Sequence, residues 1–224
     1  MAVQLYTAAS EKGHAGAMCN LGVLYEKGVG GLEADVTKAR ELYLAASEKG
    51  HPGAQCNLGM LYFRGHGVSW KQPFIKQDFD KAAELLTLSA EQGDAEGQFN
   101  LAVCFATGKG VGADIREVRR LYELSAAQGN ANAMMNLAAL YEHGVREPDC
   151  PPGHGVPKNA RAAAELYQAA VARGHQEAKL RLTAMSQYHD LPPHLDPEVL
   201  ACSAEMEQMS AIMANSPHVA SHTR

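Results

Sequence analysis

The stretch Ala17-Met-Cys-Asn-Leu-Gly-Val-Leu-Tyr-Glu-Lys-Gly28 decides the fold of this 224-residue chain, because it recurs along the sequence. Further copies begin at Ala54, Gly97 and Ala133, and a degenerate one begins at Ala178. A block that returns at a period of about 36 residues is typical of a helical solenoid, in which each unit packs only on its neighbours. We therefore predict an all-α protein that is built by adding units rather than by enlarging one core.

A second stretch, centred on a Leu-Tyr pair, separates the copies of the first. Its members are Leu5-Tyr6, Leu42-Tyr43, Leu85-Leu86, Leu121-Tyr122 and Leu166-Tyr167. Each member runs on to a glycine, which is a common residue just beyond the C-terminus of a helix. These glycines are Gly13, Gly50, Gly93, Gly129 and Gly174. The next residue stands where the following helix needs a capping side chain, and it is His14, His51, Asp94, Asn130 or His175.

Each unit is therefore predicted to contain a helix A (the Asn-Leu-Gly stretch), a glycine-rich loop, a helix B (the Leu-Tyr stretch) and a tight turn. The chain opens on a lone helix B at residues 1–12. Two of the loops between helix A and helix B are longer than the others, by seven residues near 68–77 and by nine residues near 145–153. Insertions of this kind are expected on one edge of a repeat array.

The composite pattern is A-x-x-N-L-G-x-L-Y-x-x-G-x-G-V followed by D-x-x-x-A-x-x-L-Y-x-x-A-A-x-x-G. It resembles the Sel-one-like repeat (SLR) family, which is related to the tetratricopeptide repeats. The resemblance covers residues 1–185 and departs at the two long loops and at Ala102 and Ala138, where the pattern has glycine. It implies a right-handed α-solenoid of antiparallel helix pairs that acts as an interaction scaffold. Members of the family are adaptors in many settings, so the fold alone does not select a partner.

Beyond the repeats, the sequence predicts a linker at 186–195, a helix at 196–215 and a disordered tail at 216–224. One face of the predicted helix carries Val199, Cys202, Met206, Met209 and Met213. An apolar stripe of this kind fits a cap on the exposed end of the solenoid. The alternative is that the stripe binds a partner or a second copy of the chain, because methionine adapts to many surfaces.

The composition argues against several classes of partner. The formal net charge is −5 and no basic stripe with interleaved aromatic residues is present, so we expect no nucleic acid. No run approaches the ~18 apolar residues of a membrane span, and no signal peptide is visible, so we expect no membrane. Cys19 and Cys56 stand where other copies have Phe99, Met135 and Leu180, which indicates small buried hydrophobes rather than disulfides. These features favour a cytoplasmic location.

The first candidate binding element is a row of asparagines that immediately precede the core leucine of helix A. Its members are Asn20, Asn57, Asn100 and Asn136. An amide donates and accepts at once, so the row could hold the backbone of an extended peptide if helix A lines the inside of the curve. The alternative is that each asparagine bonds to the backbone or turn of the neighbouring repeat.

Apolar residues flank this row at the positions just before and three beyond each asparagine. The first set is Cys19, Cys56, Phe99 and Met135, and the second is Val23, Met60, Val103 and Ala139. A concave apolar strip suits an amphipathic helix or an extended peptide. The alternative is that the first set belongs to the core between helices.

The first long loop supplies two more candidate anchors, Trp70 and Phe74. Exposed aromatic residues of this kind anchor interfaces. The alternative is that they fold back over a helix.

Catalytic and metal signals are thin. Gly108-Lys-Gly-Val-Gly112 lacks the Ser or Thr and the preceding strand of a phosphate loop. Asp149, Cys150 and His154 lack the second pair of ligands that a zinc site needs. We therefore expect no cofactor and no enzymatic activity, and we predict an adaptor that binds another protein. The alternatives are a structural fragment of a larger protein and an enzyme with a site in a long loop, and self-association is compatible with the pattern.

Overall fold

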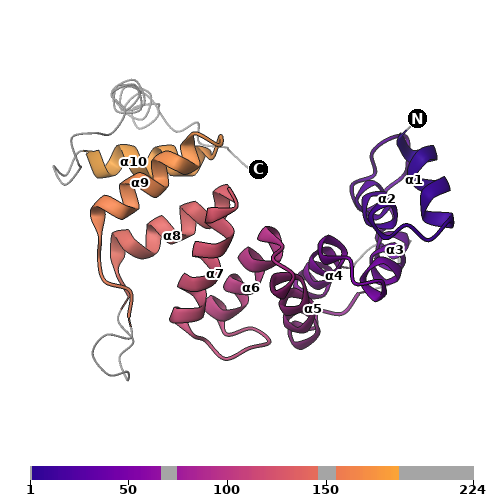
Figure 1. The fold of residues 1–224 in the computed structure, drawn as a ribbon, viewed down its shortest axis with the longest axis horizontal. Coiled ribbons are helices and arrows are strands. Elements are labelled where there is room, and N and C mark those ends of the chain that lie inside the picture. Colours follow the sequence, from indigo (N-terminus) through magenta and orange to yellow (C-terminus); the bar gives the residue numbers. More distant parts are fainter. Residues whose placement is uncertain (1, 67–74, 146–154, 187–224) are drawn as a thin grey trace, which may run out of the picture.

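The structure is a computed structural model that describes residues 2–66, 75–145 and 155–186. Within these ranges the ten α-helices follow one another along a curved array (Figure 1). The helices A are α2 (Ala15–Lys27), α4 (Pro52–Arg64), α6 (Ala95–Thr107), α8 (Ala131–His143) and α10 (Gln176–Ser186). The helices B are α1 (Ala2–Glu11), α3 (Val36–Glu48), α5 (Phe79–Glu91), α7 (Ile115–Ala127) and α9 (Ala160–Val171). The all-α prediction is confirmed, and α1 lies where residues 1–12 were expected to form a helix B.

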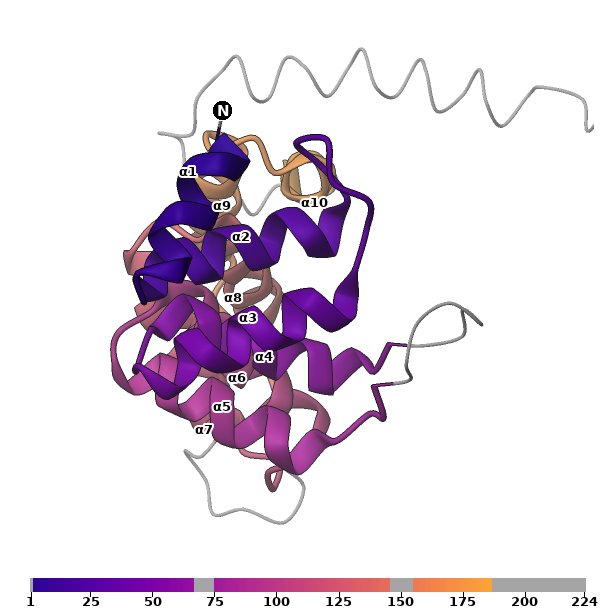
Figure 2. The same cartoon turned by 90° about the vertical axis from the view of Figure 1, so that its right-hand side faces the viewer.

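Each helix packs against the helices before and after it, so the fold is a stack of antiparallel pairs. Figure 2 shows the same stack from its end, with the pairs layered one behind another. The second residue of the Leu-Tyr pair forms the core of each complete unit: Tyr43, Leu86 and Tyr167 are fully buried and Tyr122 nearly so. None of the helices in the described ranges combines the length and apolar character needed to cross a membrane.

The glycine of the Asn-Leu-Gly stretch allows helix A to approach its own helix B closely. A Cβ atom at Gly22 would lie 2.6 Å from Cε1 of Tyr43, which is closer than real side chains approach. The equivalent residues Ala102 and Ala138 are fully buried, so the third and fourth units leave room for one methyl group. The helix pairs of these two units therefore accommodate alanine where the repeat pattern has glycine.

The residue after each turn glycine caps the next helix A, as predicted. Asp94 accepts a hydrogen bond from the Gly97 amide at 2.8 Å, and Asn130 accepts one from Ala133 at 3.0 Å. In the other three units, Nδ1 of a histidine is the acceptor at 3.2 Å, and these residues are His14, His51 and His175. The helices B begin in the same way at Asp35, Asp78, Asp114 and Asn159. The N-terminus of each of these helices is thus set by the residue that immediately precedes it in the sequence.

Both long loops are closed at their base by an antiparallel β-bridge. His66 and Ile75 exchange backbone hydrogen bonds of 2.9 and 2.7 Å, and Val145 and Val156 exchange bonds of 2.8 and 2.9 Å. Ile75 and Val156 are buried, so the returning end of each loop is anchored in the core.

The glycine that ends helix A has one backbone conformation before a short loop and another before a long loop. Gly28 and Gly108 precede short loops and have left-handed conformations, with ψ of 43° and 28°. Gly65 and Gly144 precede long loops and combine φ of 66° with ψ of 165° and 154°. That region of conformational space is essentially restricted to glycine. The same residue type therefore directs the chain into two different loop paths.

Candidate functional site

The helices A carry the predicted binding surface. Along the array, α4 packs directly against α2 and α6 as well as against helices B. Direct packing between successive helices A is expected if they lie on the inner side of the curve, where the units are closest. The asparagine row and its apolar neighbours all lie on these helices.

Two asparagines of the row bond to the preceding repeat. Nδ2 of Asn57 donates to Sγ of Cys19 at 3.6 Å, and Nδ2 of Asn100 donates to Sγ of Cys56 at 3.4 Å. The acceptor in both cases is the residue just before the asparagine of the previous unit. Asparagine and cysteine thus form one contact between successive helices A.

Asn136 bonds differently because its neighbour offers no sulfur. The equivalent acceptor position in the previous unit is Phe99, and Nδ2 of Asn136 donates instead to the hydroxyl of Tyr122 at 3.1 Å. The rings of Phe99 and Tyr122 lie 5.8 Å apart between their centroids. The row is therefore tied into the repeat packing at three successive places.

The members of the row differ in how much of them a partner can reach. Asn20 is exposed, Asn57 and Asn136 are half-buried, and Asn100 is only 7% exposed. A ligand would therefore meet Asn20 and Asn57 more readily than Asn100. Asn100 is enclosed by the packing between repeats and bonds to a cysteine side chain rather than to the backbone, whereas Asn20, Asn57 and Asn136 keep part of their surface exposed.

The apolar positions separate into a buried and an accessible set. Cys19, Cys56 and Met135 are buried and pack in the core, whereas Phe99 is half-buried. The second predicted set keeps part of its surface exposed, and its members are Val23, Met60, Val103 and Ala139. The apolar surface available to a partner is thus the second set together with Phe99.

Burial of the three described cysteines makes them poor nucleophiles. Desolvation raises the pKa of Cys56 to about 12, although its bond from Asn100 acts in the opposite direction. Desolvation also raises the pKa of Cys104 to about 11 and the pKa of Cys19 above its ordinary value. All three are free thiols. Across the described ranges, His, Cys, Asp and Glu form no group of three or more suited to a metal ion.

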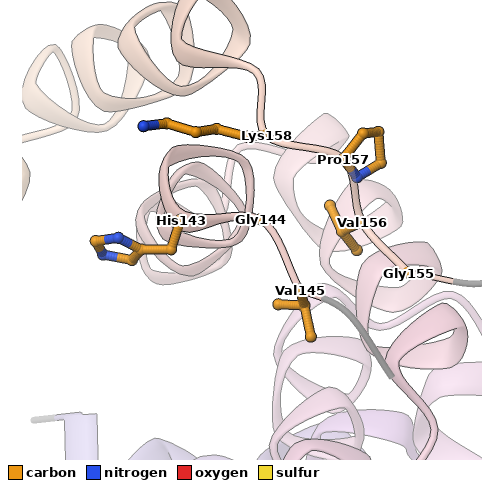
Figure 3. A pocket seen from close by; sticks show the side chains of 7 residues that line it. All are labelled: His143, Gly144, Val145, Gly155, Val156, Pro157 and Lys158. Carbon is orange, nitrogen blue, oxygen red and sulfur yellow. The ribbon is translucent and has the colours of Figure 1, made fainter. Parts of the chain in front are cut away.

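A hollow lies at the base of the second long loop. It is lined by His143, Gly144, Val145, Gly155, Val156, Pro157 and Lys158 (Figure 3). The side chains of His143 and Lys158 extend to the same side of the loop base. Basic residues also end α2 and α4, where Lys27 and Arg64 are exposed. This edge of the array therefore adds a basic border to the apolar strip.

Two predicted anchors cannot be placed on this surface. Trp70 and Phe74 lie outside the described residues, as do Asp149, Cys150, His154 and the predicted helix at 196–215.

Near the base of the first long loop, Nζ of Lys109 lies 5.3 Å from the ring centroid of Phe63 and 4.9 Å from that of Phe79. The rings of Phe63 and Phe79 pack edge to face, with 5.3 Å between their centroids.

Sequence reasoning missed two sets of polar contacts within the pairs. The hydroxyl of Tyr43 donates to Glu26 at 2.7 Å, and that of Tyr167 donates to Glu142 at 2.6 Å. Gln92 donates to Gln55 at 2.6 Å, and Gln128 donates to Gln98 at 2.9 Å. A signal was present, because tyrosine and glutamate occur together in units one and four, and the two glutamines occur together in units two and three.

The stacked pairs, shared core positions and repeated caps define an α-helical repeat protein. Five consecutive segments match the model of the Sel1 repeat, at residues 1–14, 15–51, 52–94, 95–130 and 131–175. The chain belongs to the Sel1 repeat family.

Solved structures support the same fold. A protective antigen of uropathogenic Escherichia coli with an SLR fold is 28% identical, with a TM-score of 0.70 over 94% of this chain and 40% of that one. A Sel1 repeat protein from Oxalobacter formigenes is 25% identical, with a TM-score of 0.66 over 89% of this chain and 74% of that one. An immunity protein from Pseudomonas aeruginosa is similar in fold, at 21% identity and a TM-score of 0.57, over 96% of this chain and 74% of that one. The chain thus spans less than half the length of the antigen, and a comparison with curated proteins finds no match.

Proposed function

We propose that this chain is a protein-interaction scaffold that binds a peptide or an amphipathic helix of another protein along its helices A. The observation that carries the proposal is the partly exposed strip of Val23, Met60 and Val103 beside Asn20 and Asn57. Apolar side chains at equivalent positions of successive helices offer a periodic set of anchors, and the neighbouring amides offer hydrogen bonds to a peptide backbone.

The basic border narrows the chemistry of the partner. Lys27, Arg64 and His143 recur at the ends of three helices A, and Lys158 extends to the same side as His143. A segment with apolar anchors and acidic flanking residues would complement this surface. The charges would act mainly on the association rate and would weaken with added salt.

The proposal is tested by selecting peptides from a displayed library on the purified chain and measuring their affinity by calorimetry. Replacing Met60 with Ser removes an anchor, and Asn57→Ala removes an amide. We expect each change to weaken a selected peptide about fivefold or more, which corresponds to about 1 kcal/mol.

The matched control is Leu88→Ser on α5, because Leu88 is also an exposed apolar residue but lies on a helix B. This change should leave the affinity unaltered. Selected peptides that bind Met60→Ser normally and lose affinity for Leu88→Ser would place the binding surface on the helices B and contradict the proposal.

A further inference from the structure

Lysines lie over aromatic rings at the edge of the array that carries the connections from helix A to helix B, here called the loop edge. Nζ of Lys38 is 5.0 Å from the ring centroid of Tyr25, and Nζ of Lys81 is 4.5 Å from that of Tyr62. Each lysine is the third residue of its helix B, and each tyrosine is the third residue from the end of the preceding helix A. An ammonium group within ~6 Å of a ring centroid is attracted by the face of the ring. The first two units thus place a lysine in the same way.

The third unit supplies its lysine from the loop between α6 and α7. Glu117 is the third residue of α7, so the helix itself offers no lysine there. Lys109 instead lies over the rings of Phe63 and Phe79 in the second unit. The loop can approach α5 this closely because its next residue is Gly110, where a Cβ atom would collide with the carbonyl oxygen of Phe79. A third ammonium group is therefore held beside the first two.

These three ammonium groups are exposed and keep their charge available. The ion pairs within the described ranges involve arginines and one histidine, and none involves a lysine. The carboxylates of Asp35 and Asp78 serve as caps, accepting amide hydrogens at 2.9 and 3.0 Å at the N-termini of α3 and α5, where the helix dipole stabilises negative charge. Glu33 and Asp80 are exposed at the same edge and offset part of the positive potential. An anionic ligand can therefore still reach each ammonium group.

Lysine is concentrated at the loop edge. Figure 2 shows the connection from α2 to α3 and the facing ends of α4 and α5 at this edge of the array. The lysines here are Lys27, Lys38, Lys76, Lys81, Lys109 and Lys158. Elsewhere in the described ranges, lysine occurs close to the turns at the opposite edge, at Lys12, Lys49 and Lys179. A chain with a formal net charge of −5 thus separates its lysines onto one side.

We propose that Lys38, Lys81 and Lys109, each held over aromatic rings, form a docking site for an acidic segment of another protein. The proposal rests on the proposed function in taking the ligand to be a protein, and it assigns the place of the ligand's acidic part. The ammonium groups come from the first unit, the second unit and the boundary with the third. Packed helices lie ~8–10 Å apart and an extended chain rises ~3.3 Å per residue, so about six residues that run along the array would reach all three.

The ring faces favour a carboxylate-bearing ligand over a single-stranded nucleic acid. Nucleic acids of that kind stack their bases on open aromatic faces. Here the lysines lie over the faces of Tyr25, Tyr62, Phe63 and Phe79. A carboxylate needs only the ammonium group, whose position the ring restricts before the ligand arrives.

The test measures the binding of a fluorescein-labelled dodecapeptide of alternating glutamate and glycine to the full chain, by fluorescence anisotropy at low salt. The triple variant Lys38→Gln, Lys81→Gln, Lys109→Gln should bind about tenfold more weakly, because three exposed ion pairs of ordinary strength are lost. Added salt should weaken binding to the wild type. A neutral dodecapeptide of alternating glutamine and glycine should not bind, and equal affinity for the two peptides would overturn the proposal.

The matched control removes the same number of positive charges from the opposite edge. Lys12→Gln, Lys49→Gln, Arg173→Gln changes residues at the ends of helices B and should stay within about twofold of the wild-type affinity. Equal losses in the two triple variants would show that only the net charge matters and would overturn the proposal.

The contribution of the rings is tested without changing any charge. Phe79→Leu removes the nearer of the two rings beneath Lys109, at 4.9 Å, and should weaken the acidic dodecapeptide about twofold. Unchanged affinity would contradict the role given to the rings.

Met60→Ser separates this site from the apolar strip. The dodecapeptide has no apolar anchor, so it should bind Met60→Ser as it binds the wild type, whether or not the strip binds a partner. Loss of the dodecapeptide in Met60→Ser would place it on the helices A and contradict the site at the loop edge.

Two measurements on the wild-type chain complete the test. Amide shift changes caused by the dodecapeptide should centre on Lys38, Lys81 and Lys109, and changes centred on Lys12 and Lys49 would overturn the proposal. A thymidine dodecanucleotide should bind more weakly than the acidic dodecapeptide. Tighter binding of the dodecanucleotide, with shift changes at the same lysines, would identify a nucleic-acid site instead.

Discussion

The side-chain amide of Asn136 donates a hydrogen bond to the hydroxyl of Tyr122 at 3.1 Å. In the two preceding repeats, the equivalent amides donate to cysteine sulfurs. Two substitutions accompany the change: the previous unit has Phe99 in place of the cysteine, and Ala106 stands where units one and four have the glutamate that binds tyrosine. The Tyr122 hydroxyl therefore bonds to the next repeat rather than to its own helix A.

The bond between Asn136 and Tyr122 should be measurable by a double-mutant cycle. Tyr122→Phe and Asn136→Ala should each lower the free energy of unfolding, and their coupling energy should be about 0.5–1.5 kcal/mol. Tyr141→Phe is the control, because the Tyr141 hydroxyl pairs with Glu123 at the surface and its removal should cost little. Additive effects of Tyr122→Phe and Asn136→Ala would show that the contact does not stabilise the stack.

Removing Glu142 should cost more than removing its tyrosine partner. Burial and the adjacent carboxylate both raise the pKa of Tyr167, whose hydroxyl donates to Glu142 at 2.6 Å. Glu142→Ala leaves that hydroxyl without this acceptor, and we expect a loss of about 1–3 kcal/mol in urea unfolding. Adding Tyr167→Phe to Glu142→Ala should recover part of the loss. A double variant less stable than Glu142→Ala alone would contradict this account.

Gly22→Ala should destabilise the first unit despite the higher helix propensity of alanine. The new methyl group would meet the Tyr43 ring, and overpacking of this kind costs about 1–3 kcal/mol. Tyr43→Leu in the same chain should restore part of the stability, because a Cβ atom at Gly59 in the second unit would lie 3.0 Å from Cγ of Leu86, a less severe contact than the 2.6 Å to Tyr43. The control is Gly112→Ala, where a Cβ atom would meet nothing within 4 Å. Thermal melts of the four proteins would decide, and a Gly22→Ala variant as stable as the wild type would refute the close approach.

The Cys56 thiol should make the protein sensitive to alkali. Desolvation raises its pKa from the ordinary value of 9.0 to about 12, so the folded state retains a proton that the unfolded chain has lost. Its contribution to stability is full below about pH 9 and is lost as the pH rises toward 12. The stability difference between the wild type and Cys56→Ala, measured in urea at pH 7.5 and pH 10.5, should therefore shrink at the higher pH. The difference for Leu58→Ala, another buried residue of α4, should stay constant; equal behaviour of the two variants would contradict the assignment.

The sequence predicts the parts of this fold that local chemistry encodes. Glycine at the end of each helix B, a capping residue after it and a Leu-Tyr pair in its middle were sufficient to place the helix pairs. The cross-repeat contacts were not predictable in the same way, because they depend on which atoms meet between successive units. Asn57 and Asn100 look alike in sequence, yet Asn57 is half-buried and Asn100 is nearly enclosed. The binding role of the row, of Phe99 and of Met135 therefore remains a prediction.

The β-bridges His66–Ile75 and Val145–Val156 separate the geometry of the helix pairs from the content of the loops they close. Two reciprocal backbone bonds hold the segment that leaves helix A against the segment that enters helix B. We therefore expect each bridge to be a suitable point for grafting, where a foreign segment replaces the native one and the neighbouring helices keep their register.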